Sequence, residues 1–143
     1  MALSDSEIYN ALKSGNLIIE PFDDTSVTPA GYDLRVDAEV VLEPGEQRLV
    51  ATRERVELGQ DLVGFLHIRS SLAREGIFAS LALVDPGFRG QLTISLFNGD
   101  TKAVRLRAGE RFVQLTVVKL GRQATSKYEG RYQDSTGVVS SRR

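Results

Sequence analysis

The sequence contains no cysteine and only one histidine, His67, among its 143 residues. Without cysteine the chain can form neither disulfides nor a cysteine nucleophile, and such a composition is typical of a reducing cytoplasm. The zinc site of the common nucleobase deaminases requires histidine and cysteine ligands, so this chain cannot build it. A Ser–His–Asp triad could depend only on His67. Acid–base chemistry is therefore left to carboxylates, with Mg²⁺ on oxygen ligands as the candidate metal.

The sequence also lacks an apolar run long enough to cross a bilayer, and its start shows no signal-peptide pattern. The formal net charge of −1 argues against a broad surface for nucleic acid or anionic lipid. Hydrophobic residues make up 41% and charged residues 26% of the chain, which is typical of a globular protein with one core. We therefore expect a cytoplasmic protein that binds neither nucleic acid nor membrane.

The spacing of apolar residues predicts one short helix followed by many short strands. Ser4 and Glu7 form a capping-box sequence and Gly15 provides a C-terminal stop, so we expect a helix over residues 5–14. Short strands separated by frequent glycine and proline turns predict an all-β barrel or sandwich. The strands are expected at 17–19, 32–36, 38–42, 48–51, 55–58, 62–68, 91–98, 104–107 and 111–120.

Residues 1–120 are expected to form one domain, and the composition changes after them. Residues 121–143 are rich in Gly, Ser, Thr, Lys and Arg and hold too few apolar residues to pack alone. This tail is either a mobile terminus or a lid that orders over bound phosphates through its cations and exposed N–H groups.

Two polar groups lie close together in the middle of the chain. Arg69, Ser70 and Ser71 offer a guanidinium fork beside two hydroxyls, a combination that binds phosphate oxygens. The sequence DPGFRG at 85–90 then places a carboxylate at a tight turn, followed by an aromatic ring and an arginine. Either group alone favours a surface loop or an ordinary turn. Together they indicate chemistry on a phosphorylated ligand.

Five short motifs follow one another along the chain. They are AGYDL at 30–34, LEPGE at 42–46, RSSLA at 69–73, DPGFRG at 85–90 and GERFVQL at 109–115. This series resembles the ordered motifs of the dUTPase and dCTP deaminase superfamily, and the match covers nearly the full length. Both ends of the chain, including LSD at 3–5 and RYQ at 131–133, are similar to the dCTP deaminase branch.

The resemblance implies a fold, an assembly and a substrate class. The fold would be a distorted β-barrel of jelly-roll (β-clip) type with one short N-terminal helix. The assembly would be a homotrimer with nucleotide sites at the subunit interfaces. The substrate would be a pyrimidine deoxynucleoside triphosphate. Mg²⁺ would be held mainly through the triphosphate, with Asp33 as a further ligand through water.

The resemblance also implies roles for individual residues, carried over by position. Asp85 would hold or deprotonate the attacking water, and Asp33 would help to order the site. Strand alternation by itself is equally compatible with an exposed Asp33 that has no such role. Phe88 would pack on the deoxyribose, where a ribose 2′-hydroxyl would clash.

The same transfer implies the other contacts with the nucleotide. A hairpin over residues 77–84, which includes Ala82 and Val84, would read the pyrimidine through its backbone. Four tail residues would close over the triphosphate of another subunit's site, and five residues of the domain would hold substrate directly. The domain residues are Arg69, Ser70, Ser71, Arg74 and Gln114, and the tail residues are Lys127, Tyr128, Arg131 and Tyr132.

One position distinguishes the two branches of the superfamily. In the deaminase branch, a glutamate five residues after the last glycine of the turn motif activates the water that attacks cytosine. Counted from Gly90, this position is Ser95. A neutral serine cannot serve as the general base that a carboxylate provides. We therefore predict a dUTP diphosphatase that forms dUMP and pyrophosphate.

Two alternatives stay open at this point. A mono- or bifunctional dCTP deaminase, converting dCTP to dUTP or dUMP, would need a substitute carboxylate, and Glu75 is the nearest in sequence. Arg74 and both termini match that branch. A non-catalytic nucleotide-binding member of the family is the second alternative, because the base-reading segment at 77–84 is short and almost wholly apolar.

Overall fold

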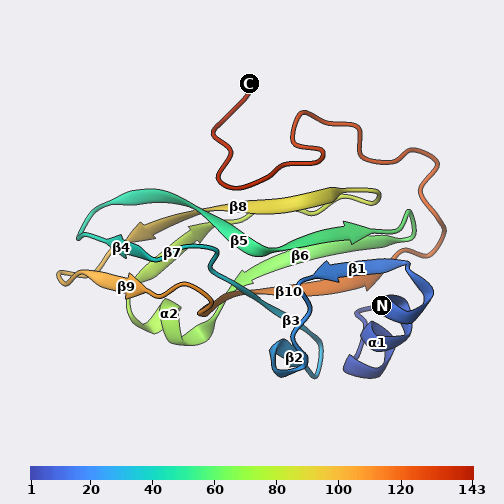
Figure 1. The fold of residues 1–143 in the computed structure, drawn as a ribbon, viewed down its shortest axis with the longest axis horizontal. Coiled ribbons are helices and arrows are strands. Elements are labelled where there is room, and N and C mark those ends of the chain that lie inside the picture. Colours follow the sequence, from blue (N-terminus) through green and yellow to red (C-terminus); the bar gives the residue numbers. More distant parts are fainter.

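The N-terminal helix begins and ends where the sequence predicts. In this computed structural model, which describes all residues from 1 to 143, α1 spans Asp5–Ser14 (Figure 1). The Ser4 hydroxyl accepts the amide N–H of Glu7 at 3.4 Å, and the Glu7 carboxylate accepts the amide N–H of Ser4 at 2.9 Å. These two bonds satisfy N–H groups that a first helical turn leaves free. Gly15 ends the helix with a φ of 74°, a conformation that costs glycine little.

Antiparallel β structure makes up most of the rest of the chain, as the sequence predicts. The strand orders are β1-β5-β8-β7, β2-β3-β10-β6 and β4-β9. The strands are β1 (Leu17–Glu20), β2 (Val27–Thr28), β3 (Gly31–Arg35), β4 (Val40–Leu42), β5 (Gln47–Leu58), β6 (Leu62–Ile68), β7 (Ile77–Ser80), β8 (Arg89–Asn98), β9 (Val104–Leu106) and β10 (Arg111–Lys119). Two short helical segments, η1 (Asp24–Ser26) and α2 (Ser70–Arg74), complete the fold.

Two of the predicted strands are in fact one. Residues 48–51 and 55–58 both belong to β5, whose pairing with β8 changes register between Ala51 and Arg55. Such an irregularity bends a strand and interrupts its alternation, which is why the sequence pattern predicts a break there. Helix α2 is not predicted either, because five residues are too few to show a helical period.

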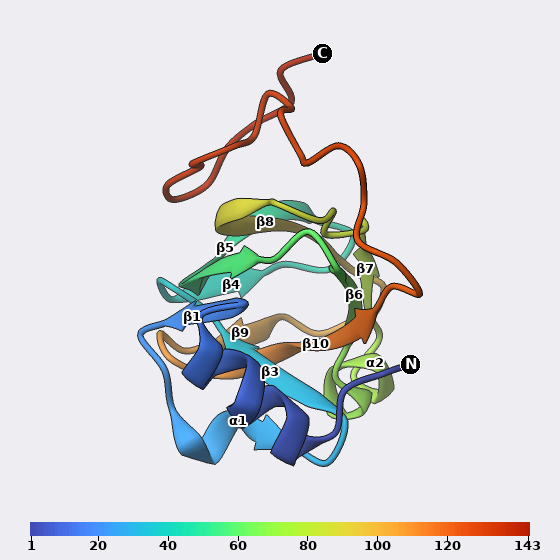
Figure 2. The ribbon, with the colours of Figure 1, turned by 90° about the vertical axis from the view of Figure 1, so that its right-hand side faces the viewer.

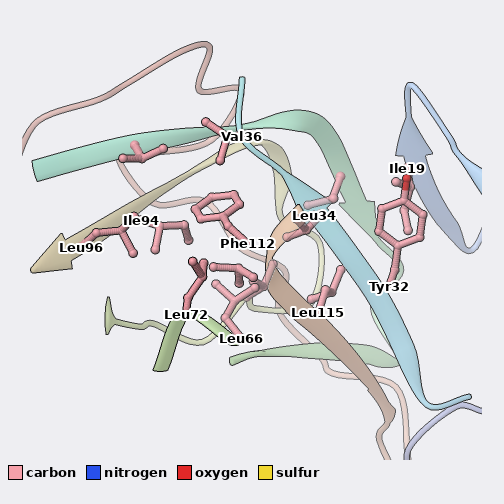
Figure 3. Close-up of a cluster of buried hydrophobic side chains, with 14 of the residues drawn as sticks. Ile19, Tyr32, Leu34, Val36, Leu66, Leu72, Ile94, Leu96, Phe112 and Leu115 are labelled. Carbon is pink, nitrogen blue, oxygen red and sulfur yellow. The ribbon is translucent and has the colours of Figure 1, made fainter. Parts of the chain in front are cut away.

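The hydrophobic core lies between the two four-stranded sheets. Figure 2 shows β5 and β8 on one side and β3 and β10 on the other. Phe112 of β10 lies at the centre, between Ile94 of β8 and Leu34 of β3, and all three side chains are at most 2% exposed (Figure 3). Because no hydrogen-bonded ladder joins the sheets, the barrel is distorted and open, and the predicted jelly-roll type of fold is confirmed.

The tail after β10 returns across the outer face of β8 (Figures 1 and 2). It forms no helix and no strand, but Ser135 makes an isolated parallel bridge with Gly90. The amide of Tyr128 donates to the carbonyl of Pro86 at 2.8 Å, and the amide of Gln91 donates to the carbonyl of Ser135 at 2.9 Å. The polar tail therefore packs on the domain in spite of its composition. Neither α1 nor α2 has the length and the apolar composition needed to cross a bilayer.

Candidate active site

A cavity of about 500 Å³ lies under the tail on the outer face of β8. Its walls come from β5, β8, the connection that joins β7 to β8, and the tail. Six of the residues predicted for the site line this cavity. They are Ala82, Val84, Asp85, Phe88, Tyr128 and Tyr132. Segments that are separated by about forty residues in sequence thus build one site.

The turn at 85–90 presents the Asp85 carboxylate to the cavity. The amide of Phe88 donates to the carbonyl of Asp85 at 3.1 Å, and Gly87 adopts a φ of 80°, which favours glycine. A Cβ atom on Gly87 would lie 2.6 Å from Cβ of Lys127, so the tail packs directly on this turn. The Asp85 carboxylate is exposed and forms no hydrogen bond or ion pair with the chain. It is therefore free to orient a water molecule.

Two aromatic rings form one wall of the cavity. Phe88 is only 6% exposed, and the ring of Tyr128 stands edge-on to it with centroids 5.4 Å apart. This contact joins the turn to the tail, and offset or edge-to-face packing of this kind is favourable. A flat, apolar wall of this size fits a sugar or a base.

Ser95 lies in the cavity and carries no charge. The Nε2 atom of Gln47 donates to its hydroxyl at 2.8 Å. Its register partners are Leu49 on β5 and Ser80 on β7. Glu75, the carboxylate nearest in sequence, follows α2 and does not line the cavity. Asp85 is therefore the one carboxylate that lines the cavity together with Ser95.

A second polar group gathers on the other sheet, around Asp33. Gln114 of β10 is the register partner of Asp33 on β3 and of His67 on β6. Nε of Arg69 lies 3.1 Å from Oδ2 of Asp33. Burial raises the pKa of Asp33, and the positive charges of Arg69 and Arg111 partly offset that rise.

The burial of Asp33 answers the question that strand alternation leaves open. Asp33 is only 4% exposed, and Tyr32 and Leu34 beside it are fully buried. Both faces of β3 are covered here, so alternation does not place Asp33 in solvent. A buried carboxylate that is paired with an arginine is costly to keep, which favours a role in the site.

Ser70, Ser71 and Arg74 are all exposed on α2, directly after Arg69. Neither these three residues nor Arg69 or Gln114 line the cavity beside Phe88. The single chain therefore holds two separate groups of predicted site residues, one on each sheet. The resemblance implies sites at subunit interfaces, and in the single chain the predicted residues lie on two surfaces.

The predicted base-reading hairpin over 77–84 is wrong in its extent. Only residues 77–80 form a strand, and this strand, β7, pairs with β8. The amide N–H of Val84 donates to the carbonyl of Gly64, and the carbonyl of Val84 accepts the amide N–H of Gly64, both at 2.9 Å. The N–H of Val84 is therefore not free to read a base. Ala82 is exposed and forms no backbone hydrogen bond, so its peptide groups keep that capacity.

Residues 133–139, here called the strap, hold the tail on β8. Asp134, at a φ of 58°, forms a two-bonded ion pair with Arg89, with Oδ1 to Nε at 2.6 Å and Oδ2 to Nη2 at 2.9 Å. Gln133 donates to the carbonyl of Gly87 at 2.9 Å and accepts from the amide of Arg89 at 2.9 Å. The tail therefore covers the cavity of its own chain. The resemblance implies instead that the tail closes over the site of another subunit. Lys127 and Arg131 are exposed and lie outside the cavity wall.

The ion pair between Asp134 and Arg89 predicts a measurable effect on the strap. We expect Asp134→Asn to raise amide hydrogen exchange over residues 133–139 about two- to fivefold, because a neutral amide keeps the backbone turn but loses the charge. Hydrogen bonds from Arg89 lower the pKa of Asp134. The pair is therefore complete at neutral pH and is lost only as pH falls through that lowered pKa.

The control for this measurement is Lys119→Gln on β10, in the sheet that does not carry the strap, which removes an exposed ion pair with Asp61. Added salt should bring wild type and Asp134→Asn together, since exposed charges are screened. Equal exchange in both proteins at low salt would mean that backbone and amide bonds hold the strap without the ion pair.

Comparison with known proteins agrees with this fold. The family model of dCTP deaminase-like proteins matches residues 36–120. A dCTP deaminase of Pyrococcus furiosus is 45% identical over 89% of this chain and 91% of its own length. A probable deoxyuridine 5′-triphosphate nucleotidohydrolase of Sulfolobus islandicus rod-shaped virus 1 is 33% identical over 97% of both chains.

Solved structures show the same fold. The dUTPase of Staphylococcus bacteriophage 80alpha, in a mutant form with dUpNHpp, has a TM-score of 0.62 and 22% identity over 80% of this chain and 97% of its own. A dUTPase of phage phi11 of S. aureus, described with a structural Mg(II) ion, has a TM-score of 0.63 and 20% identity over 80% of this chain and 97% of its own. The architecture is thus that of the superfamily of dUTPases and dCTP deaminases.

Within this superfamily the chain belongs to the dCTP deaminase-like family. The relatives are named as enzymes of both branches, and the chain is an enzyme of the dUTPase or dCTP deaminase type. The resemblance that the sequence motifs carry is confirmed.

Proposed function

We propose that the protein is a dUTP diphosphatase that hydrolyses dUTP to dUMP and pyrophosphate. The observation that carries this proposal is the cavity itself, where a free carboxylate, Asp85, faces an apolar wall and the neutral Ser95 occupies the position of the deaminase glutamate. Deamination of cytosine needs a general base at the ring, whereas phosphoanhydride hydrolysis needs one only at the attacking water.

In this mechanism Asp85 orients a water molecule and accepts its proton. The water oxygen forms a bond to the α-phosphorus, the bond from that phosphorus to the bridging oxygen breaks, and pyrophosphate leaves. Phe88, closed from one side by Tyr128, holds the deoxyribose so that the phosphorus stays within reach of the water.

The residues present fit a magnesium ion that is held mainly by the substrate. No group of three or more carboxylate or imidazole side chains gathers anywhere in the chain, and Asp33 is a buried carboxylate whose charged partner is Arg69. Such an arrangement suits an ion whose ligands are chiefly triphosphate oxygens, with Asp33 reaching it through water. When bound, Mg²⁺ would neutralise phosphate charge.

The proposal includes a homotrimer with shared sites. Asp33, Arg69 and Gln114 lie on a different sheet from the cavity. A second copy of the chain, related by closed threefold symmetry, would supply this phosphate-binding group to the cavity of the first. Ser70, Ser71 and Arg74 would join Arg69, and Lys127 and Arg131 would reach the triphosphate from the tail.

A dCTP deaminase is the second candidate, and the 45% identity to a protein of that name favours it. It would require a base other than position 95, and Glu75 does not line the cavity. Its activity would release ammonia, which hydrolysis of dUTP does not.

The test is a pair of incubations with dUTP and with dCTP, each with Mg²⁺, followed by chromatography that separates the substrates from dUMP, dCMP and dUTP. We expect dUTP to become dUMP and dCTP to remain unchanged. Conversion of dCTP to dUTP or dUMP would refute the diphosphatase assignment in favour of a deaminase. No change in either substrate would leave a nucleotide-binding protein.

A further inference from the structure

Three polar side chains from neighbouring strands line the cavity: Gln47, Ser80 and Ser95. Ser80 and Ser95 are register partners on β7 and β8, so both point to the outer face of the sheet. Gln47 of β5 reaches across to Ser95, with Nε2 donating to Oγ at 2.8 Å. Leu49 and Leu83 are among the apolar residues around them. A few polar groups in an apolar cavity are what orients a ligand.

Apart from Asp85, the other polar side chains of the cavity are already bonded to the chain. Gln91 donates to a β5 carbonyl at 2.8 Å and accepts the amide of Gly137 at 2.6 Å. Thr93 Oγ1 accepts the amide of Val139 at 3.0 Å, and the Ser135 hydroxyl donates to a tail carbonyl at 2.6 Å. These groups hold the strap. The cluster at Gln47 is therefore the part of the cavity that keeps hydrogen-bonding capacity for a ligand.

The hydrogen bond between Gln47 and Ser95 decides which atoms of this cluster are left to donate and which to accept. Because the Ser95 oxygen accepts from the Gln47 amide, its own O–H is left to donate elsewhere. The Oε1 atom of Gln47 forms no hydrogen bond with the chain and remains an acceptor. A donor and an acceptor thus lie side by side. Uracil presents the complementary edge, with a carbonyl oxygen at C4 next to N3–H, whereas cytosine presents an amino group next to an unprotonated nitrogen.

We propose that Gln47, oriented by Ser95, is a specificity-determining residue that selects uracil over cytosine in this cavity. The inference rests on the proposed function and extends it to the choice of base. Cytosine would place its amino group against the Ser95 O–H and its bare N3 against the Gln47 oxygen. A site built to pair with polar groups rejects an analogue that leaves those groups unpaired.

The test measures dissociation constants of Mg²⁺-bound α,β-imido-dUTP and α,β-imido-dCTP by calorimetry. We expect wild type to bind the uracil analogue more tightly. Gln47→Leu should reduce that preference about tenfold, mainly by weakening the uracil analogue. Gln47→Glu keeps an acceptor opposite N3–H and still repels the bare N3 of cytosine, so it should retain more of the preference than Gln47→Leu. The matched control is Gln60→Leu, since Gln60 pairs with Gln123 outside the cavity.

The outcomes separate the two proposals. If Gln47→Leu keeps the wild-type preference while the wild type still hydrolyses dUTP, Gln47 does not select the base and the diphosphatase assignment stands. If wild type binds both analogues equally, the selection by Gln47 is refuted. If wild type fails to hydrolyse dUTP, the proposed function itself is refuted.

Discussion

Asp85→Asn is expected to lower kcat for dUTP by about 100- to 10,000-fold, the range that a general base usually contributes. The variant should fold normally, because the Asp85 carboxylate is exposed and bonds to nothing in the chain. Binding of α,β-imido-dUTP should stay within about twofold of wild type, since Asp85 acts on the water and not on the nucleotide. The measurement is steady-state release of pyrophosphate beside calorimetric binding. Undiminished turnover would remove Asp85 from the mechanism.

Mixing variants tests the shared site. Arg69→Ala should also be inactive, because it removes the guanidinium that pairs with Asp33. In the proposed trimer, the cavity of one subunit works with the Arg69 group of the next. Reassembly of equal amounts of Asp85→Asn and Arg69→Ala should therefore restore about a quarter of wild-type activity, the random share of sites with both halves intact. No recovery on mixing, with subunit exchange shown by mass spectrometry, would mean that each site belongs to one chain.

Glu54→Ala is expected to lower the free energy of unfolding by about 3–5 kcal/mol, the usual cost of breaking a buried ion pair. Glu54 is fully buried, and its carboxylate accepts from Nε and from the backbone amide of Arg35 at 2.6 and 2.9 Å. The side chain of Arg35 is only 13% exposed, and its remaining carboxylate partner is Asp23 at 3.3 Å. Without Glu54 a buried cation would remain poorly compensated. This loss is a large part of the about 5–15 kcal/mol that holds an ordinary domain together.

Urea denaturation followed by circular dichroism measures this effect. Glu39→Ala, which removes the exposed partner of Arg105, serves as the control and should change stability by less than about 1 kcal/mol. The double variant Arg35→Met/Glu54→Leu should be more stable than Glu54→Ala, because neither charge is then left unpaired. A Glu54→Ala protein as stable as the control variant would show that the pair contributes little. Arg35 lies two residues from Asp33 on β3. The same ion pair therefore joins β3, the strand that carries Asp33, to β5.

Local patterns in the sequence predict the parts of the fold that depend on neighbouring residues. The capping box at Ser4 and Glu7 predicts α1 because its bonds span three residues. Alternation along β8 predicts that Ile94 faces the core while Ser95 faces outward. The ordered motifs likewise identify the superfamily. In each case the information lies within a few positions of the chain.

The sequence does not predict features that depend on contacts between distant residues. Asp33 could be exposed or buried by alternation alone, and only the packing around β3 decides that it is buried. The bond of Val84 to Gly64 removes a predicted base contact, and no local signal marks it. Gln47 escapes sequence reasoning for the same reason, because a glutamine near a strand start is ordinary until it meets Ser95.

The sequence by itself determined the fold class and the superfamily, because motifs and periodicity act over short stretches of chain. Only the tertiary structure decided that the cavity and the Asp33 group lie on different sheets, and that the tail covers its own cavity through Arg89 and Asp134. These arrangements follow from pairing between strands and segments far apart in sequence, where burial and hydrogen-bond satisfaction of the whole chain outweigh local preference.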